Sequence, residues 1–237
     1  MPETILVVSA HSADFVWRAA GAIALAVEGG AEAHVLALSY GERGESGELW
    51  KEPGQTEARV KEIRHGEAEA AADALGASFR SLDLGDYPLV MDAPAVDRLT
   101  DLLRELSPRL VLTHAALDPF NPDHGVAHDA TVRARQLASG AGVASGFVTI
   151  TPPELLSFEP HQPELCGFVP TTFLDITPVW EKKVAAMEAM GAQAYLRQYY
   201  TERAGHRANH ARRISGRDDV RYAEAFQREL PAVVDAL

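Results

Sequence analysis

Short apolar runs alternate with longer helical stretches over the first 150 residues, and this alternation constrains the fold more than any other feature of the chain. The run at residues 4–9 is rich in β-branched residues and has no helical period, which is typical of a strand buried on both faces. The stretch at 15–28 has near-helical apolar spacing and ends at two glycines. Repeated units of this kind predict a parallel sheet with right-handed crossovers.

The same signals place the remaining elements. Further strands are expected at residues 33–39, 78–84, 110–114, 147–150, 154–158 and 172–176. Further helices are expected at residues 57–75, 95–106, 125–138, 179–190, 194–204 and 219–229. We therefore predict a single domain over 1–237: an α/β, Rossmann-like parallel sheet flanked by helices on both faces (1–150), with a small C-terminal strand and helix extension of the same domain (151–237).

Charge and composition limit the partners of the chain. With Lys+Arg 22 and Asp+Glu 34, the formal net charge is -12 at pH 7, so neither nucleic acid nor an anionic membrane surface is expected as a partner. An anionic ligand would need a local arginine cluster or a metal ion. The N-terminus lacks the basic region of a signal peptide, and no run approaches the roughly 20 apolar residues of a membrane span. Because the single cysteine, Cys166, cannot form an intrachain disulfide, we expect a soluble, cytoplasmic protein.

Polar side chains follow two of the predicted strands. His11 and Asp14 come after the first strand, and His124 closes a polar segment after the strand at 110–114. Ligands in such folds bind beyond the carboxyl ends of the strands. His11 and Asp14 alone are explained equally simply as a turn residue and a helix N-cap. Together with His124 they form a His/Asp/His set that suits a catalytic zinc with an open position.

These motifs resemble the zinc-dependent LmbE/PIG-L family, most of whose members are N-acetylglucosamine-type deacetylases. The resemblance rests on HSAD at 11–14, RHGE at 64–67 and NPDH at 121–124, and by motif it covers roughly the first 130 residues. It implies a homo-oligomer with one zinc ion per subunit. The zinc ligands that it implies are His11, Asp14 and His124.

Two departures from the family pattern argue against deacetylation. The family motif Ala-His-Pro-Asp-Asp places its general base on Ala13 and its proline on Ser12. The leading histidine of the second motif falls on Asn121. Positioned acid–base groups contribute about 100- to 10,000-fold each, so ordinary deacetylation is not expected.

Other segments resemble the hydratase branch of this family, and this resemblance spans nearly the whole chain. They are SA at 12–13, GERGES at 41–46 and FEPHQPELCGF at 158–168. Members of the branch add water to 4-oxalomesaconate, an unsaturated oxo-tricarboxylate of gallate and protocatechuate breakdown, to give 4-carboxy-4-hydroxy-2-oxoadipate. The resemblance implies a metal-dependent hydro-lyase with a small polycarboxylate substrate.

Hydration of such an acid needs a Lewis acid, a base that activates water and an acid that protonates the enolate carbon. The long loop at 40–55 supplies Glu45 and Glu48, one of which is expected to be the base. His161 is expected to serve as the acid or as a carboxylate anchor. The choice among these three residues stays open.

Arginines are the expected contacts for the substrate carboxylates. We assign this role to Arg43 and Arg64, with Ser12 and Asn121 as further substrate contacts. A basic segment lies at 197–213, and most of its residues are interpreted as a solvated helix face or a subunit contact, while one or two of its arginines could reach a substrate, including that of a neighbouring subunit.

Two alternatives to the hydratase remain open. One is an N-acetyl-sugar deacetylase of the LmbE/PIG-L type in which Glu45 or Glu48 replaces the missing base. The other is a non-catalytic protein that binds a metal or a carboxylate.

Overall fold

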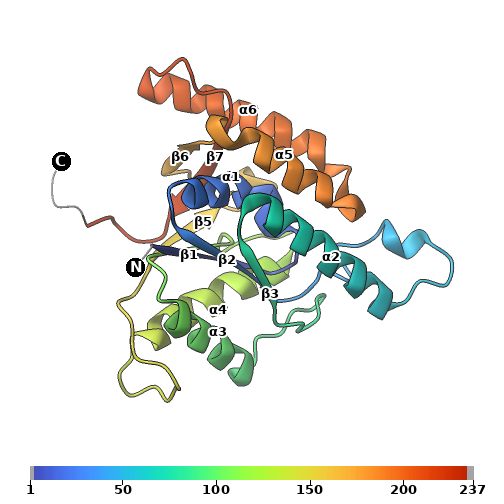
Figure 1. Cartoon of the computed structure of the whole chain (residues 1–237), viewed down its shortest axis with the longest axis vertical. Coiled ribbons are helices and arrows are strands. Elements are labelled where there is room, and N and C mark those ends of the chain that lie inside the picture. The colour runs from blue at the N-terminus through green and yellow to red at the C-terminus, as the bar shows by residue number, and fades with distance from the viewer. Residues whose placement is uncertain (1–2, 234–237) are drawn as a thin grey trace.

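Residues 3–233, the part of the chain that the computed structural model describes, form one seven-stranded sheet in the order β3-β2-β1-β4-β5-β7-β6 (Figure 1). The strands are β1 (Thr4–Ser9), β2 (Glu32–Ala37), β3 (Ser78–Ser81), β4 (Leu110–Thr113), β5 (Glu154–Phe158), β6 (Thr172–Asp175) and β7 (Ala223–Arg228). Strands β1 to β5 pair in parallel, and β7 pairs antiparallel with both β5 and β6. The predicted α/β class is confirmed.

Helices cover both faces of this sheet (Figure 1). On one face lie α1 (Asp14–Glu28), α2 (Glu57–Leu75), α5 (Trp180–Ala189) and α6 (Leu196–Ser215). On the other lie α3 (Ala93–Leu106) and α4 (Pro122–Ala138). Because side chains alternate along a strand, β1 sends Ile5 and Val7 into the first apolar layer and Leu6 and Val8 into the second.

Local signals explain where the helices begin and end. The Thr56 side chain accepts a hydrogen bond from the Arg59 amide at the start of α2, and Gly76, in the left-handed region at φ 76°, ends that helix. The Asp92 side chain caps α3 in the same way by accepting from the Ala95 amide. The predicted bounds of α2 are therefore confirmed.

The structure corrects two of the predicted elements. The predicted strand at 147–150 lies in the segment between α4 and β5, and β5 takes the place beside β4 instead. The predicted helix at 219–229 is strand β7. Its sequence, AEAFQR, has helical propensity, but pairing with two neighbouring strands overrides that preference. The C-terminal extension thus joins the same sheet.

A buried ion pair fastens α1 to β7. The Glu224 carboxylate accepts hydrogen bonds from the Gly21 and Ala22 amides at 2.8 and 2.9 Å, and from Lys183 Nζ at 2.7 Å. Lys183 also donates to the Trp17 carbonyl at 3.0 Å. A Cβ at Gly21 would lie 2.4 Å from Ile176 Cγ2, so only glycine allows this close approach.

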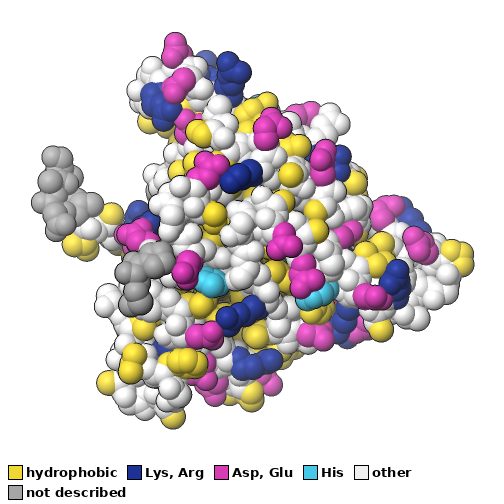
Figure 2. Space-filling model, in the orientation of Figure 1, with side chains coloured by type: hydrophobic (Ala, Val, Ile, Leu, Met, Phe, Trp, Pro, Cys, Tyr) yellow, Lys and Arg dark blue, Asp and Glu magenta, His cyan; other side chains and the backbone are white. Residues whose placement is uncertain are grey.

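Over the described residues, no helix is both long and apolar enough to cross a membrane. On the face shown in Figure 2, acidic and basic side chains are interspersed rather than separated into patches.

Candidate metal centre and active site

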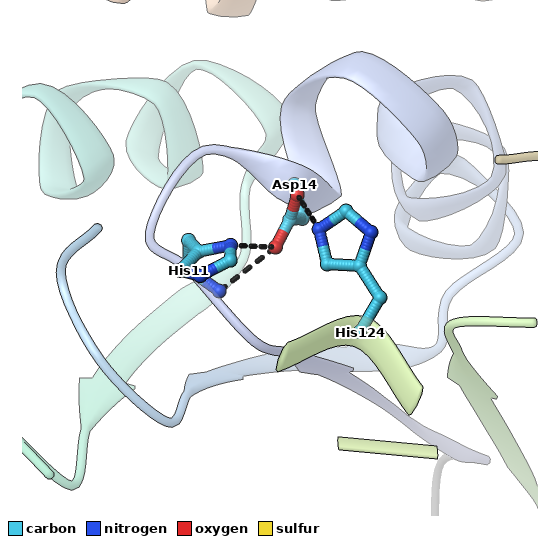
Figure 3. A group of neighbouring side chains, drawn as sticks. All are labelled: His11, Asp14 and His124. Atoms are coloured by element: carbon cyan, nitrogen blue, oxygen red, sulfur yellow. Dashed lines mark hydrogen bonds and ion pairs between the residues drawn. The ribbon is translucent and has the colours of Figure 1, made fainter. Parts of the chain in front are cut away.

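Three buried ligand groups meet at the carboxyl ends of β1 and β4 (Figure 3). His11 follows β1, Asp14 is the first residue of α1, and His124 lies in the first turn of α4. One ligand atom from each lies within 4.8 Å of the others. The fold therefore brings together the three residues that the sequence predicted as metal ligands.

Two further carboxylates orient the imidazoles of this group. Asp123 Oδ2 lies 3.3 Å from His11 Nε2, and Asp118 Oδ2 lies 2.9 Å from His124 Nδ1. The opposite nitrogens, His11 Nδ1 and His124 Nε2, lie 3.3 and 3.5 Å from the Asp14 carboxylate and have no hydrogen-bond partner among the described residues. A histidine held by a carboxylate through one nitrogen presents the other to a metal, so these residues fit a divalent cation.

The charge distribution around His11 also favours a cation. Burial lowers the pKa of His11, but the nearby carboxylates of Glu45, Asp123 and Asp14 outweigh burial and raise it to about 10. Burial works in the opposite direction on Asp14, where His114, His124 and His11 hold the pKa well below its usual range. Negative charge therefore concentrates where the three ligand atoms converge.

His114 packs against the ligand group and hydrogen-bonds the backbone next to it. Its Nε2 accepts a hydrogen bond from the Ala10 amide at 2.9 Å, and its ring stacks on His124 with 4.1 Å between the ring centroids. Burial and the neighbouring His124 hold the pKa of His114 well below 6.5. His114 is thus a buried, hydrogen-bonded histidine.

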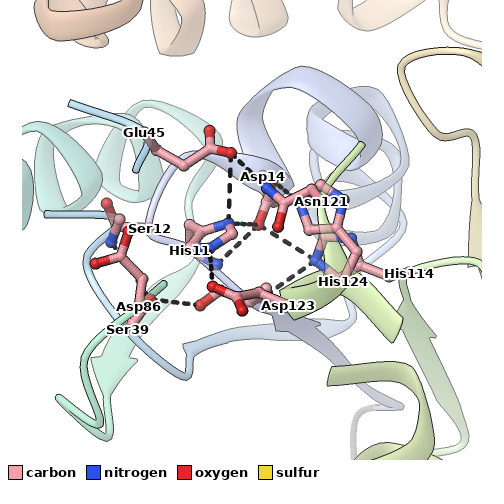
Figure 4. A network of polar contacts seen from close by, with 12 residues as sticks. His11, Ser12, Asp14, Ser39, Glu45, Asp86, His114, Asn121, Asp123 and His124 are labelled. Atoms are coloured by element: carbon pink, nitrogen blue, oxygen red, sulfur yellow. Dashed lines mark hydrogen bonds and ion pairs between the residues drawn. The ribbon is translucent and has the colours of Figure 1, made fainter. Parts of the chain in front are cut away.

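The Glu45 side chain extends from the loop after β2 to the ligand group formed by His11, Asp14 and His124 (Figure 4). Its Oε1 lies 3.8 Å from His11 Nδ1 and accepts from Asn121 Nδ2 at 2.7 Å. Its Oε2 accepts from Gln193 Nε2 at 2.8 Å. The two amides fix a carboxylate beside the ligand group, whereas Ala13 offers no base. No sequence signal pointed to Gln193.

The loop is fastened so that Glu45 points inward. The Asp86 carboxylate accepts from the Arg43 and Gly44 amides at 2.8 and 2.7 Å. A Cβ at Gly44 would lie 2.3 Å from the Tyr87 ring, so the loop can pack on Tyr87 only through glycine. The 86–87 segment thus sets the path of the loop.

Four other predicted site residues have different partners. Glu48 is 54% exposed and pairs with Lys51 at 2.6 Å. Arg43 pairs with Glu57 at the surface, at 3.3 Å. The remaining two hold the loop. Ser12 Oγ donates to the Tyr40 carbonyl at 2.8 Å, and the buried Arg64 donates to that carbonyl and to the Glu67 and Gln193 side chains. Glu45 therefore lies beside the ligand group whereas Glu48 lies at the surface, and Arg43 and Arg64 are engaged by other side chains.

His161 is half-buried and contacts two tyrosines of α6. Its ring stacks on Tyr199 at 4.1 Å, and its Nδ1 lies 3.5 Å from Tyr200 Oη. Burial, Arg18 and Arg203 lower the pKa of His161, against the weaker influence of Asp118 and Glu45.

Two arginines of the 197–213 segment are not part of a solvated face, because they bind a buried carboxylate. Arg203 Nη1 donates to Glu159 at 2.5 Å, and Arg207 Nε donates to both Glu159 oxygens at 3.0 and 2.9 Å. These arginines lie on the side of α6 that faces Glu159, which follows β5 and is itself buried. The order of the charges along the helix gave no hint of a buried acceptor 44 residues earlier.

Fold and site together define a class: α/β proteins with a candidate metal-binding group at the carboxyl ends of a mostly parallel sheet. The chain belongs to the PIG-L family, because the family described as "PIG-L: GlcNAc-PI de-N-acetylase" matches residues 6–135. The predicted family is thus confirmed.

Relatives in this family include hydratases and deacetylases. The chain is 48% identical to a protein of Pseudomonas putida KT2440 named 4-oxalmesaconate hydratase, over 99% of this chain and 92% of that protein. A crystal structure of GalB, the 4-carboxy-2-hydroxymuconate hydratase of the same organism, matches with a TM-score of 0.96 and 47% identity over 99% of both chains. N,N'-diacetylchitobiose deacetylase from Pyrococcus horikoshii shares the fold, with a TM-score of 0.79 and 19% identity over 95% of this chain and 83% of that one.

Proposed function

We propose that this protein is a metal-dependent hydro-lyase that adds water to 4-oxalomesaconate and forms 4-carboxy-4-hydroxy-2-oxoadipate in aromatic-acid breakdown. The near full-length similarity to a hydratase, 48% identity over 99% of the chain, carries the proposal. The site supports it independently. The position of the deacetylase base is Ala13, and the Glu45 carboxylate approaches the ligand group from another element.

One zinc ion per subunit is the proposed cofactor. His11 Nδ1, the Asp14 carboxylate and His124 Nε2 would hold it, since two imidazoles and one carboxylate are a common ligand set of catalytic zinc. Bound there, zinc supplies Lewis-acid polarisation of the oxo-carboxylate end of the substrate. Asp123 and Asp118 keep both imidazoles in the required orientation.

Side chains of the chain itself move the protons. Glu45 takes a proton from water while the water oxygen bonds to one alkene carbon, and the Asn121 and Gln193 amides hold the carboxylate in place. The electron pair of the double bond passes into the conjugated oxo-carboxylate, and the other alkene carbon then receives a proton. His161 is proposed as the donor of that proton or as a carboxylate anchor. The sum is the addition of one water.

The test is the loss of the conjugated ultraviolet absorbance of 4-oxalomesaconate after addition of zinc-loaded protein. A parallel sample treated with chelator and stripped of metal is the control, and metal content is measured in both. We expect rapid decay only in the zinc-loaded sample. Equal traces from the two samples would refute the metal-dependent hydratase. Release of acetate from an N-acetyl sugar would instead support the deacetylase.

A further inference from the structure

The buried cations around α1 have dedicated partners, with one exception. Lys183 binds Glu224 and the Trp17 carbonyl, and Arg203 binds Glu159. Arg18, whose side chain is only 7% exposed, makes no hydrogen bond to any residue of the 3–233 range. Its Nε is buried, and the nearest carboxylate oxygen, Asp14 Oδ1, lies 3.7 Å away.

Asp14 does not serve as a partner for Arg18 in the way that Glu224 serves Lys183. Its two oxygens already face the His11 amide and three imidazoles, and they belong to the ligand group. Two other carboxylates, Glu159 and Glu224, line a cavity of about 20 Å³ together with Arg18. Both of them are engaged by other donors, so neither one neutralises Arg18.

The surroundings nevertheless keep Arg18 charged. Burial opposes the charge, but the nearby carboxylates of Asp14, Glu45 and Asp118 favour it, and the pKa of the guanidinium lies above its usual range. The Phe158 ring, 5.9 Å from Cζ, adds a weak cation–π contact. A buried charge without a hydrogen-bonded partner is rare, and at a functional site it indicates a ligand of opposite charge.

A neutral donor lies beside this cation. Tyr200 is buried, and its ring stacks on Trp17 with centroids 5.5 Å apart. Burial raises the pKa of Tyr200 to about 12, so the hydroxyl keeps its proton. Its contact with His161 Nδ1 is long, at 3.5 Å, which leaves the hydroxyl able to donate elsewhere.

We propose that Arg18 binds a carboxylate of the substrate, with the Tyr200 hydroxyl as a second donor, and so positions a polycarboxylate beside the metal ligands. The inference rests on the proposed function and deepens it. A planar guanidinium matches a carboxylate in a two-point contact, and one helical turn separates Arg18 from Asp14. One carboxylate is thereby held while another end of the same molecule faces His11 and His124. Arg18 thus takes the role that the sequence had assigned to Arg43 and Arg64.

The test measures binding without turnover. Tricarballylate, a saturated tricarboxylate that cannot be hydrated, is titrated calorimetrically into the zinc-loaded protein and its variants. We expect Arg18→Gln to weaken binding about 10- to 100-fold, Arg18→Lys to restore part of the loss, and metal content to stay unchanged. Arg80→Gln is the matched control, because Arg80 pairs with Glu105 at the surface. Tyr200→Phe, which keeps the stacked ring, should weaken binding to a smaller extent.

The outcomes separate this inference from the hydratase itself. With 4-oxalomesaconate, Arg18→Gln should raise KM more than it lowers kcat. If the wild type binds tricarballylate through Arg18 but does not hydrate 4-oxalomesaconate, the carboxylate site stands and the hydratase fails. If the wild type hydrates and Arg18→Gln leaves both KM and tricarballylate binding unchanged, the inference fails alone. Absence of saturable tricarballylate binding by the wild type also overturns it. If Arg18→Gln does not fold, the tricarballylate affinity and the KM of Tyr200→Phe are measured instead, and values equal to those of the wild type overturn the inference.

Discussion

Two groups of buried charge adjoin α1, and they differ in how completely their atoms are paired. In the anchor group, Lys183 and Glu224 bind each other and three backbone groups of α1. In the ligand group, His11 Nδ1, His124 Nε2 and Arg18 Nε have no hydrogen-bond partner among the described residues. Since unpaired buried polar atoms are costly, a fold retains them where a ligand completes them. Of these two groups, the anchor group is completely paired, and the ligand group keeps atoms that a ligand can complete.

The largest difference between the ligand group and the anchor group is expected from a substitution at the metal ligands' neighbour Glu45, which leaves the fold intact. Glu45→Gln keeps the shape of the side chain but removes the base, so kcat should fall about 100- to 10,000-fold. Glu48→Gln is the matched control, because an exposed ion pair contributes little, and it should keep kcat within about twofold. Stopped-flow absorbance with 4-oxalomesaconate measures both. The reverse ranking would move the base to Glu48.

A change in the anchor group should have the opposite effect. Lys183→Met leaves Glu224 buried without its cation and should lower the free energy of unfolding by about 3–5 kcal/mol, measured by urea denaturation. Lys182→Met removes an exposed pair with Glu28 and should change stability by less than about 1 kcal/mol. The folded Lys183 variant should keep its metal content. Loss of metal at unchanged stability would contradict the division into two groups.

The carboxylates of Asp118 and Asp123, which orient the two imidazoles, belong with the ligand group. Asp118→Asn weakens the hold on His124 and should lower zinc affinity about 10- to 100-fold, with little loss of stability. Competition with a chromophoric chelator measures this affinity. Asp129→Asn, at an exposed position of α4, provides the comparison. Equal affinities in the two variants would show that Asp118 does not act on the site.

The smallest effect on stability is expected at the partly buried pair of His128 and Glu229. His128 Nε2 lies 3.7 Å from Glu229, which follows β7. Burial lowers the pKa of His128, but Glu229 and Asp129 outweigh burial and raise it above 6.5. The resulting stability is present below pH 6.5, where the unfolded chain is also protonated, and is lost as the pH rises through the higher folded pKa.

Urea denaturation of His128→Gln between pH 6 and 8.5 tests this linkage. The wild type should lose more stability than the variant across this range, by about 1.4 kcal/mol for each unit of pKa difference. His206→Gln, at an exposed position of α6, should follow the wild type. If the free energy of unfolding of His128→Gln and of the wild type changed equally with pH, His128 would not contribute to the pH dependence.

The sequence predicted what lies close together in the chain or at the ends of strands. His11, Asp14 and His124 follow buried strands of a parallel sheet, so topology alone places them at one edge. Asp118 and Asp123 lie in the same polar segment as His124, and their roles could have been suspected there. Arg18 lies on the helix predicted at 15–28, four residues after Asp14, and in the structure α1 carries both on one face.

Residues whose partners are distant could not be assigned in this way. Gln193 and Glu45 are 148 residues apart, and only the folded path of the 40–55 loop decides between Glu45 and Glu48. Arg43 and Arg64 were plausible clamps by charge, but Glu57 and Glu67 on α2 bind them. Strand β7 was missed because its pairing partners, β5 and β6, lie far back along the chain.

The anchor of α1 also orders events during synthesis. Gly21 and Glu224 are 203 residues apart, so the helix that carries Asp14 and Arg18 leaves the ribosome long before the strand that fastens it. A nascent chain already contains His11, Asp14 and His124 when β7 has yet to be translated. Completion of the ligand geometry is therefore a late event, and the metal is expected to enter after translation of β7 rather than while the first strands emerge.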